Sequence, residues 1–426
     1  MGLVAVVAVT AVACGSTKSS SSTSSSGSGS GSGNSAIPSS AFSDHTGITA
    51  TSVRVANVST LAIGGLFKGA LVGTEAYADY VNSTGGVNGR KITVDSADDG
   101  FSGAGNKQAT QNALTNDFSL VGGFSLQDNF GGQLLASNPG MPNVSVVLDP
   151  TTNKLPNVFS AVPLNGGWEE GPLQYYKTKF PKAIDAVGTV VSDQSSAQRD
   201  WAGQKYAMEQ VGYKVIYDPS VPVTQTDYTQ NVIAMKNAGV KILFLSQLPQ
   251  NYASAMLKNL QQQNFHPQVI LGSANYSNDL VSASGGPSAV NGALFDQNTS
   301  LFLGQDAPQI PAVGLFNKWV QKASPGFKTD LFTLYGWLSA ELFSQALKNA
   351  GSNPSRGSLL QALSKIDSFS GDNIIAPNDP AAKTVGNCYL LGQVANGKYE
   401  RLADPPINSA TNGYRCDYKY ITPPAS

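Results

Sequence analysis

Two successive runs of alternating strand and helix patterns constrain the fold of this chain more than any other feature of its sequence. In the first run, apolar and polar residues alternate over 52–58, and apolar residues recur at helical spacing over 67–81. The second run occupies 184–271 and contains the nearly continuous apolar segment 241–245, which is typical of a strand with helices on both faces. Such alternation predicts parallel sheets with right-handed crossovers, so we expect an α/β fold with two doubly wound parallel-sheet lobes.

Composition and motifs exclude several functional classes. Charged residues make up 13% of the 426-residue chain, the net charge is −1 and no Lys/Arg cluster occurs, so we expect no nucleic-acid partner. Only two histidines occur, which argues against His-rich metal sites and His-based catalytic triads. The sequence contains no GxxxxGK[ST], HExxH or GxSxG motif. We therefore expect a protein that is not an enzyme, with no catalytic residue, no metal site and no cofactor.

Residues 1–14 are interpreted as an export signal. An apolar run over 3–13 is too short to span a bilayer, and small residues precede Cys14, as in the lipobox of bacterial lipoproteins. This resemblance implies lipidation of Cys14 and a lipid anchor at the extracytoplasmic face of the cell membrane. Residues 15–49 begin with a Ser/Gly-rich tract that cannot bury enough apolar surface to fold, so this segment is predicted to be a flexible tether.

Two cysteines remain once Cys14 is assigned to the lipid anchor. Cys388 opens a predicted hairpin with strands 388–394 and 398–401, and Cys416 follows this hairpin. In an exported protein two remaining cysteines are expected to form one disulfide, with two free buried thiols as the alternative.

The segment 120–129, LVGGFSLQDN, carries the strongest signal for a ligand site. Two apolar residues end a strand, two glycines allow a turn, and Asp128 is placed to cap a helix that begins near Asn129. Ligands of open α/β sheets bind outside the carboxyl ends of the strands, where helix N-termini supply free N–H groups. Asp128 is therefore interpreted as a helix cap, with direct contact to a ligand as the alternative.

Residues 67–99 resemble the start of type I periplasmic binding proteins. The likeness is carried by Gly69, Glu75, the GGVNGRKI segment at 85–92 and the acidic pair 98–99. The similarity is to the leucine/isoleucine/valine-binding type, which serves ABC importers. Three later segments, 156–159, 239–244 and 335–351, also resemble conserved segments of that family.

The resemblance implies two lobes joined by a three-segment hinge, with a ligand held in the cleft between them. The first lobe would comprise 50–162 with 299–372, and the second 163–298 with 373–421. A protein of this kind captures a small molecule and delivers it to the permease subunits of an ABC transporter, and we expect it to act as a monomer.

The same resemblance indicates how a ligand is held, and this sequence departs from the family there. In amino-acid-binding members, Ser/Thr hydroxyls hold the ligand carboxylate, and an acidic residue of the second lobe holds the ammonium group. Here Asp128 and Asp149 stand in the first-lobe loops that would hold the carboxylate. Ala274 occupies the second-lobe position that is acidic in those members. Carboxylates repel one another, and an unpaired ammonium loses a charge-assisted hydrogen bond. The sequence therefore favours a neutral or weakly cationic polar ligand over an ordinary α-amino acid.

The predicted ligand contacts follow strand ends in both lobes and offer polar groups, which suit neutral polar ligands, or apolar faces. They are Phe124, Ser125, Leu126, Gln127, Val147, Leu148, Ser195, Gln198, Gln247, Leu248, Asn275 and Tyr276. For Ser195, capping the helix over 196–211 is the alternative role.

Two further functions compete with solute delivery to an importer. A ligand-sensing protein that reports to a membrane or regulatory partner would use the same fold, although lipid anchoring favours transport. A hydrolase would need paired carboxylates such as Asp128 and Asp149, and no pattern places these two as a pair. The sequence thus favours an extracytoplasmic solute-binding lipoprotein of an ABC importer.

Overall fold

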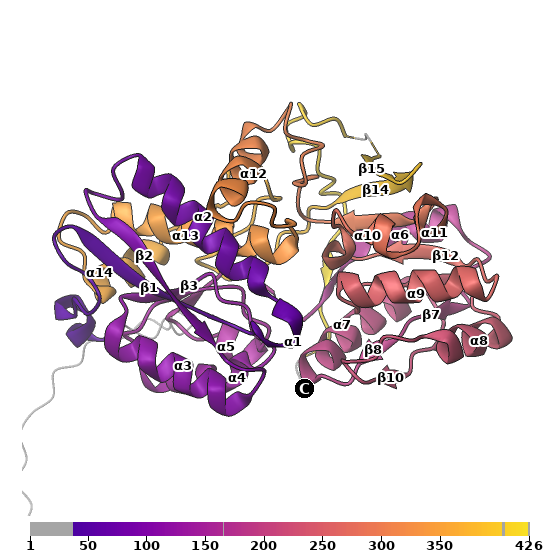
Figure 1. Cartoon of the computed structure of the whole chain (residues 1–426), viewed down its shortest axis with the longest axis horizontal. Helices are drawn as coiled ribbons and strands as arrows, with labels where there is room; N and C mark the ends of the chain where they lie inside the picture. The colour runs from indigo at the N-terminus through magenta and orange to yellow at the C-terminus, as the bar shows by residue number, and fades with distance from the viewer. Residues whose placement is uncertain (1–36, 165, 403–404, 425–426) are drawn as a thin grey trace, which may run out of the picture. The chain divides into compact units, whose positions relative to one another are not determined.

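The computed structural model describes residues 37–164, 166–402 and 405–424 (Figure 1). The predicted signal peptide, Cys14 and most of the predicted tether lie outside the described residues. The tether is predicted to end at 49, but a short 3-10 helix, η1 (Ser39–Ser43), already buries Ala41. Asp44 accepts a hydrogen bond from the buried Arg356 at 2.9 Å. The folded part therefore begins before residue 49, because this guanidinium takes its carboxylate partner from the predicted tether.

The first lobe contains a five-stranded sheet in the order β2-β1-β3-β4-β5, with every neighbouring pair parallel. Its strands are β1 (Ser52–Ser59), β2 (Lys91–Asp98), β3 (Ser119–Val121), β4 (Asn143–Val144) and β5 (Val158–Phe159). The helices between these strands are α1 (Ala62–Gly65), α2 (Lys68–Ser83), α3 (Gly103–Asn116), α4 (Asp128–Ser137) and α5 (Pro150–Asn153). Three later helices complete this half, namely α12 (Pro311–Ala323), α13 (Leu331–Asn349) and α14 (Arg356–Leu363). Strand β4 comprises only two residues.

The second lobe contains a seven-stranded sheet in the order β15-β14-β13-β12-β11-β7-β9. Its strands are β7 (Val187–Gly188), β9 (Val215–Tyr217), β11 (Ile242–Phe244), β12 (Gln268–Leu271), β13 (Leu294–Gln297), β14 (Leu390–Ala395) and β15 (Lys398–Arg401). Its helices are α6 (Glu170–Lys179), α7 (Ser195–Val211), α8 (Thr229–Ala238), α9 (Gln250–Gln262), η2 (Ser273–Asn275), α10 (Leu280–Ala283) and α11 (Pro287–Val290). The five strands β13, β12, β11, β7 and β9 are parallel to one another. The predicted hairpin β14–β15 adds two antiparallel strands at the β13 edge.

Two small ladders lie outside these sheets. An irregularity at β7 interrupts the ladder with β9, and β8 (Val191–Ser192), which follows β7 closely in sequence, pairs instead with β10 (Ser220–Val221). A second ladder joins β6 (Trp168–Glu169) to β16 (Tyr420–Ile421), in antiparallel register. The predicted α/β class with parallel-sheet lobes is confirmed, whereas the lobe boundaries near 162, 298 and 372 stay predictions.

Helix α13 packs directly against α2, and Figure 1 shows the two side by side in orange and indigo. Glycines allow this close approach. A Cβ atom on Gly73 of α2 would lie 1.9 Å from the carbonyl oxygen of Thr333, and one on Gly336 of α13 would lie 2.0 Å from that of Ala70. Asp330 caps α13 by accepting a hydrogen bond from the N–H of Thr333 at 2.8 Å.

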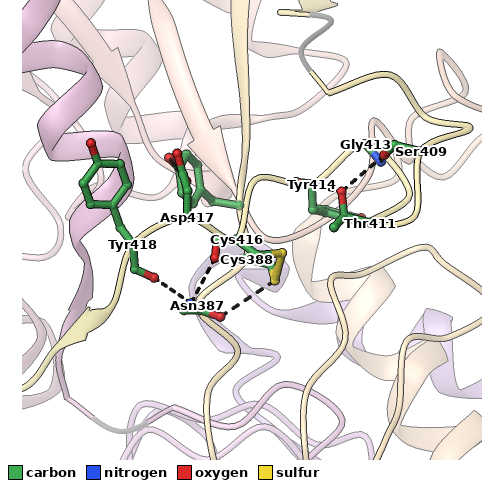
Figure 2. Close-up of a disulfide and its surroundings, with 10 residues drawn as sticks. Asn387, Cys388, Ser409, Thr411, Gly413, Tyr414, Cys416, Asp417 and Tyr418 are labelled. Carbon is green, nitrogen blue, oxygen red and sulfur yellow. Dashed lines mark hydrogen bonds between the residues drawn. A yellow bond between two sulfur atoms is a disulfide. The ribbon is translucent and has the colours of Figure 1, made fainter.

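The disulfide between Cys388 and Cys416 is present, as the cysteine count predicted (Figure 2). It closes a loop with a sequence separation of 28 residues around the edge hairpin. The side-chain amide of Asn387 donates hydrogen bonds to the carbonyl oxygens of Cys416 and Tyr418, at 3.5 and 2.6 Å (Figure 2). The C-terminal segment that forms β16 is thereby attached to the second lobe.

We expect Gly73→Ala to destabilise the protein, because the added methyl group meets rigid backbone of α13. Overpacking of this kind costs about 1–3 kcal/mol, measured as the free energy of unfolding in urea. The matched control is Gly314→Ala in α12, where the nearest heavy atom is 4.0 Å away. The control should gain about 0.5–1 kcal/mol from helix propensity, and equal stability of the two variants would contradict a close α2–α13 packing.

Candidate functional site

A cavity of about 290 Å³ lies at the carboxyl ends of strands from both sheets. The loops after β3 and β4 contribute Phe124 and Leu148, and the ends of β11, β12 and β13 contribute Gln247, Ser273 and Asn298. Helix α13 and helix α7 supply further walls. This is the position at which open α/β sheets bind ligands, and the volume is close to the lower end of the range for small-molecule sites.

Four aromatic side chains form one side of the cavity, and we call them the aromatic wall: Phe67, Phe124, Phe332 and Tyr335. The ring centroid of Phe67 is 4.7 Å from that of Phe124 and 4.6 Å from that of Phe332. Phe332 and Tyr335 are three residues apart, so they share one face of α13. Phe124 is held in place because its N–H donates to Ser59 Oγ at 3.1 Å. The wall is therefore fixed by the first sheet and α13 together.

Three acidic side chains lie on the other side, and we call them the carboxyl cluster: Glu169, Asp200 and Asp296. Tyr176 donates its hydroxyl to Asp296 at 2.7 Å, and the Gln247 amide donates to Asp200 at 3.0 Å. Among the described residues that line the cavity, none is Lys, Arg or His. The cavity therefore pairs an apolar side from the first lobe with a second-lobe side that carries the acidic groups among apolar residues such as Phe244 and Ile270.

The electrostatics of the carboxyl cluster are dominated by burial. Burial, with smaller contributions from Asp296 and Asp200, raises the pKa of Glu169 to about 7. Burial also raises the pKa of Asp296 to about 6, although the hydrogen bond from Tyr176 opposes this shift. The pKa of Asp200 is raised by burial as well. Asp200 is solvent-exposed and the other two are half-buried, and the accessible surface of all three faces the cavity.

One face of α7 carries a row of polar groups into the cavity. Ser196, Asp200 and Gln204 are four residues apart and so point in the same direction. The Ser196 hydroxyl and the Gln204 amide nitrogen are buried and have no hydrogen-bond partner within the described structure. The same holds for the side-chain oxygen of Gln297, whose amide nitrogen donates to the backbone of Ser300 at 3.0 Å. Buried polar atoms are almost always paired, so these groups indicate a binding site.

The structure brings some of the sequence-predicted contacts together around this cavity. Those that line it are Phe124, Leu126, Leu148, Gln247 and Leu248. Val147 instead packs in the core behind the loop after β4. Ser125 is buried, donates its hydroxyl to the Asp99 carboxylate and accepts a hydrogen bond from the N–H of Gln127 at 2.9 Å. Ser125 and Gln127 thus shape the loop after β3 and do not line the cavity.

The predicted second-lobe contacts lie mostly outside the cavity. Ser195 is exposed and is the first residue of α7, and the helix has no side-chain N-cap, so the alternative cap role is wrong. Gln198 donates its amide to the carbonyl oxygen of Ser192 at 2.6 Å. Asn275 is fully buried and donates to the carbonyl oxygen of Leu248 at 2.7 Å. The side chains of Gln198 and Asn275 thus support loops that line the cavity.

Tyr276 is buried in the core of the second lobe. Its ring lies 4.6 Å from Tyr399 and 4.9 Å from Phe302, and its hydroxyl donates to Gln305 at 2.5 Å. The preceding residues Ser273 and Ala274 line the cavity in its place. The short helix η2 accounts for this offset, because it turns the chain between Ala274 and Tyr276.

Asp128 and Asp149 have structural roles. Helix α4 begins at Asp128 itself and has no side-chain cap, so the prediction that Asp128 caps this helix is wrong. Its carboxylate accepts hydrogen bonds from the N–H groups of Leu148 and Asp149, at 2.5 and 3.1 Å, and so holds the neighbouring loop. Asp149 caps α5 through the N–H of Thr152 at 2.8 Å and lies 3.8 Å from Arg199 of α7. Neither aspartate lines the cavity.

Sequence reasoning missed the carboxyl cluster, the α13 side chains and the polar face of α7. Two signals were available. Asp296 is a charged residue that follows the apolar pair Leu294 and Phe295 in an interior strand of the sheet. Polar residues also recur every four positions from Ser196 to Gln204. Glu169 and Tyr335 carry no comparable signal, because only the tertiary structure brings them to the same space.

A cavity at the carboxyl ends of two doubly wound sheets is typical of a two-lobed solute-binding protein. The family model for periplasmic binding proteins matches residues 57–398, and the chain belongs to this family. Members are substrate-binding proteins that act outside the cytoplasm. In the described ranges, no helix combines the length and the hydropathy needed to cross a bilayer.

Individual proteins show the same likeness. The chain is 28% identical over 345 residues to a Leu/Ile/Val-binding protein homolog 1 of Brucella melitensis, covering 79% of this chain and 86% of that protein. A fatty acid ABC transporter substrate-binding protein from Thermomonospora curvata has a TM-score of 0.70 at 17% identity, over 89% of this chain and 95% of that one. A branched-chain amino acid ABC transporter protein from Thermus thermophilus, solved with bound valine, has a TM-score of 0.70 at 15% identity, over 85% and 98%. The structural likenesses support the fold.

We expect Glu169→Gln to stabilise the ligand-free protein at pH 8. A carboxyl group whose pKa is raised from 4.5 to about 7 contributes stability below its unfolded pKa, and this contribution is lost as the pH rises through 7. A neutral amide removes this dependence, so the melting temperature should fall less between pH 5 and pH 8 than it does in the wild type. Parallel melting curves for the two proteins would contradict a desolvated Glu169.

Proposed function

We propose that this protein is an extracytoplasmic solute-binding lipoprotein that captures a small molecule in the cavity and delivers it to an ABC importer. The observation that carries the proposal is the cavity itself, which is lined by both sheets at their carboxyl ends. Family membership supports solute binding, and the similar proteins from Thermomonospora curvata and Thermus thermophilus are named for ABC transporters, which supports such a transporter as the partner. The lobes of the proposed hinge are 50–162 with 299–372 and 163–298 with 373–421.

The proposed ligand contacts are the side chains that line the cavity. From the sequence-predicted set we retain Phe124, Leu126, Leu148, Gln247 and Leu248. To these we add the aromatic wall, the carboxyl cluster and Gln204. The lining is mainly apolar and aromatic, with polar groups at defined positions, and such sites hold a ligand by its apolar body and orient it by its polar head.

The nature of the lining separates this protein from relatives named for amino acids. The ligand carboxylate of an amino acid would enter a cavity that has three acidic side chains and, among its described lining residues, no cationic one. Desolvation next to like charges is unfavourable for a carboxylate. We therefore propose a neutral or weakly cationic ligand with an apolar body, although the Brucella relative is named for leucine, isoleucine and valine.

The ion pair between Asp149 and Arg199 supports a closing movement of the lobes. Asp149 belongs to the loop after β4 of the first sheet, and Arg199 belongs to α7 beside the second sheet, with 3.8 Å between their charged atoms. Arg199 is exposed and Asp149 is half-buried, and a pair near the surface contributes about 1 kcal/mol or less. It therefore favours the closed arrangement without preventing reopening, and ligand contacts would supply most of the free energy of closure.

Ligand sensing is the alternative function for the same fold. Uptake of the labelled ligand by intact cells separates the two, because deleting the gene abolishes uptake if the protein serves an importer. A sensor would leave uptake unchanged and alter only the response to the ligand.

We expect Phe332→Ala to weaken ligand binding tenfold or more, because about 1.4 kcal/mol of aromatic contact is sufficient for that change. A thermal-shift screen over amines, amides, alcohols and carboxylates identifies a ligand, and calorimetry then measures its dissociation constant. The matched control is Phe130→Ala, since Phe130 is 37% exposed and does not line the cavity. Equal weakening in both variants would refute the cavity as the binding site, and the absence of stabilisation by any compound would refute solute binding.

We expect Cys14→Ser to transfer the protein from the membrane fraction to the soluble extracytoplasmic fraction, because the lipid anchor is lost. Fractionation followed by mass spectrometry of the N-terminal peptide measures the change. Ser16→Ala is the control and should remain membrane-bound. A mature wild-type protein with an unmodified Cys14 thiol would contradict the anchor.

A further inference from the structure

The two sides of the cavity differ in chemistry, and this difference is specific enough to name a ligand class. The aromatic wall comes from the first lobe and α13, whereas the carboxyl cluster comes from β6, α7 and β13. A ligand that fills the cavity must therefore present an apolar end to the wall and a different end to the carboxyl groups.

Two oxygen atoms and one amide nitrogen beside the carboxyl cluster have no hydrogen-bond partner within the described structure, and the nitrogen is that of Gln204. The Ser196 hydroxyl and the Gln297 side-chain oxygen are more than nine-tenths buried, line the cavity and have no partner within the described structure. The Gln297 amide nitrogen already donates to the carbonyl oxygens of Thr299 and Ser300, so its oxygen is held in one orientation. Carboxylates together with unpaired oxygens call for a ligand that donates several hydrogen bonds.

We propose that the cavity binds an organic cation, a protonated amine with an apolar or aromatic body. Its ammonium group lies among Glu169, Asp200 and Asp296, and its body lies against the aromatic wall. The proposal rests on the proposed function in one respect, namely that this cavity is the solute site.

Electrostatics exclude the opposite charge from this position. An ammonium group between ionised carboxylates gains charge-assisted hydrogen bonds, which are roughly twice as strong as neutral ones. A ligand carboxylate would meet three acidic groups with no guanidinium or ammonium partner among the described lining residues. Arg199 precedes Asp200 in α7, but its guanidinium lies against Asp149 and does not line the cavity. A hydroxyl in place of the amine would keep hydrogen bonds but lose the charge.

The aromatic residues near the cluster favour the same ligand. Tyr335 and Tyr420 both line the cavity and lie close enough to Glu169 and Asp200 for these charges, in addition to burial, to raise their pKa values. Both phenols therefore remain neutral at physiological pH. Neutral aromatic rings attract cations through their π faces, so an ammonium group has favourable partners on both sides.

Binding of a cation must depend on pH through the carboxyl cluster. The other titratable groups that line the cavity are Tyr335, Tyr389 and Tyr420, and burial raises the pKa of each. Tyr176, which donates to Asp296, also stays neutral because burial raises its pKa. Since burial raises the pKa values of the carboxyl groups, protons compete with the cation at low pH, and affinity rises as the pH increases from 5.5 to 8.

Calorimetric titration of the full chain with three probes of one shape tests the proposal. The probes are 2-phenylethylamine, 2-phenylethanol and 3-phenylpropionate, each measured at pH 5.5 and pH 8. We expect the amine to bind at least tenfold more tightly than the alcohol at pH 8, with no detectable binding of the carboxylate. The affinity for the amine should rise at least fivefold between the two pH values, whereas that for the alcohol should stay constant.

Two variants assign the effect to the cluster. Glu169→Gln should weaken amine binding at pH 8 at least tenfold and reduce its pH dependence, and Asp296→Asn provides a second test on a different strand. The matched control is Glu170→Gln, since Glu170 is adjacent in sequence, accepts a hydrogen bond from Gln174 at 2.9 Å and does not line the cavity. This control should bind the amine as the wild type does.

Four outcomes would overturn the ligand class. These are tighter binding of the carboxylate or the alcohol, no effect of either cluster variant, equal effects of Glu169→Gln and Glu170→Gln, and stabilisation by calcium alone. In each of these cases a compound from the thermal-shift screen that still binds in the cavity would leave the proposed solute-binding function standing. Failure of every compound in that screen would instead overturn solute binding itself.

Discussion

The close contact between α2 and α13 is the interaction on which the rest of the structure depends. Residues 331–349 return to the first sheet from far along the chain, and Gly73 and Gly336 let the two backbones meet without intervening side chains. Trp337 is buried within this packing. Because α13 is enclosed on most of its surface, its rotation is fixed, and the two aromatic side chains that it contributes to the cavity are fixed with it.

The second lobe reaches the same space by a different route, which explains the unequal chemistry of the two sides. Its polar cavity-facing groups lie on the strands, at strand ends and along one face of α7, beside core side chains such as Phe244 and Ile270 that also line the cavity. Gln247 connects them, since its amide donates to Asp200 at 3.0 Å and to Gln204 at 2.8 Å. The aromatic wall thus continues the core of the first lobe, whereas the second lobe adds a hydrogen-bonded network of acidic and amide groups to the edge of its own core.

The sequence predicts the fold better than the site for physical reasons. Periodicity reports which residues face a core, so the alternating elements and the loops at strand ends were predictable, and Phe124 and Gln247 were found because they follow strand ends. Periodicity does not report which residues of a helix buried on most faces look into a cavity, and Tyr335 was missed for that reason. Asn275 was misplaced because the turn of η2 directs its side chain to Gly272 and Leu248 instead of the cavity.

The carboxyl cluster has an energetic consequence for the empty protein under the proposed function. Acidic groups with pKa values raised by burial disfavour the folded state at neutral pH, and a core of apolar residues in their place would avoid this penalty. A loss of stability of this kind is retained in proteins where the destabilising groups are needed for binding. A cation that enters the cavity restores the ionised forms and supplies donors to oxygens that have none, so the unfavourable electrostatics of the empty site become selectivity for the ligand. Neutral solutes of the same shape would leave that penalty in place, and the cavity would discriminate by charge before it discriminates by size.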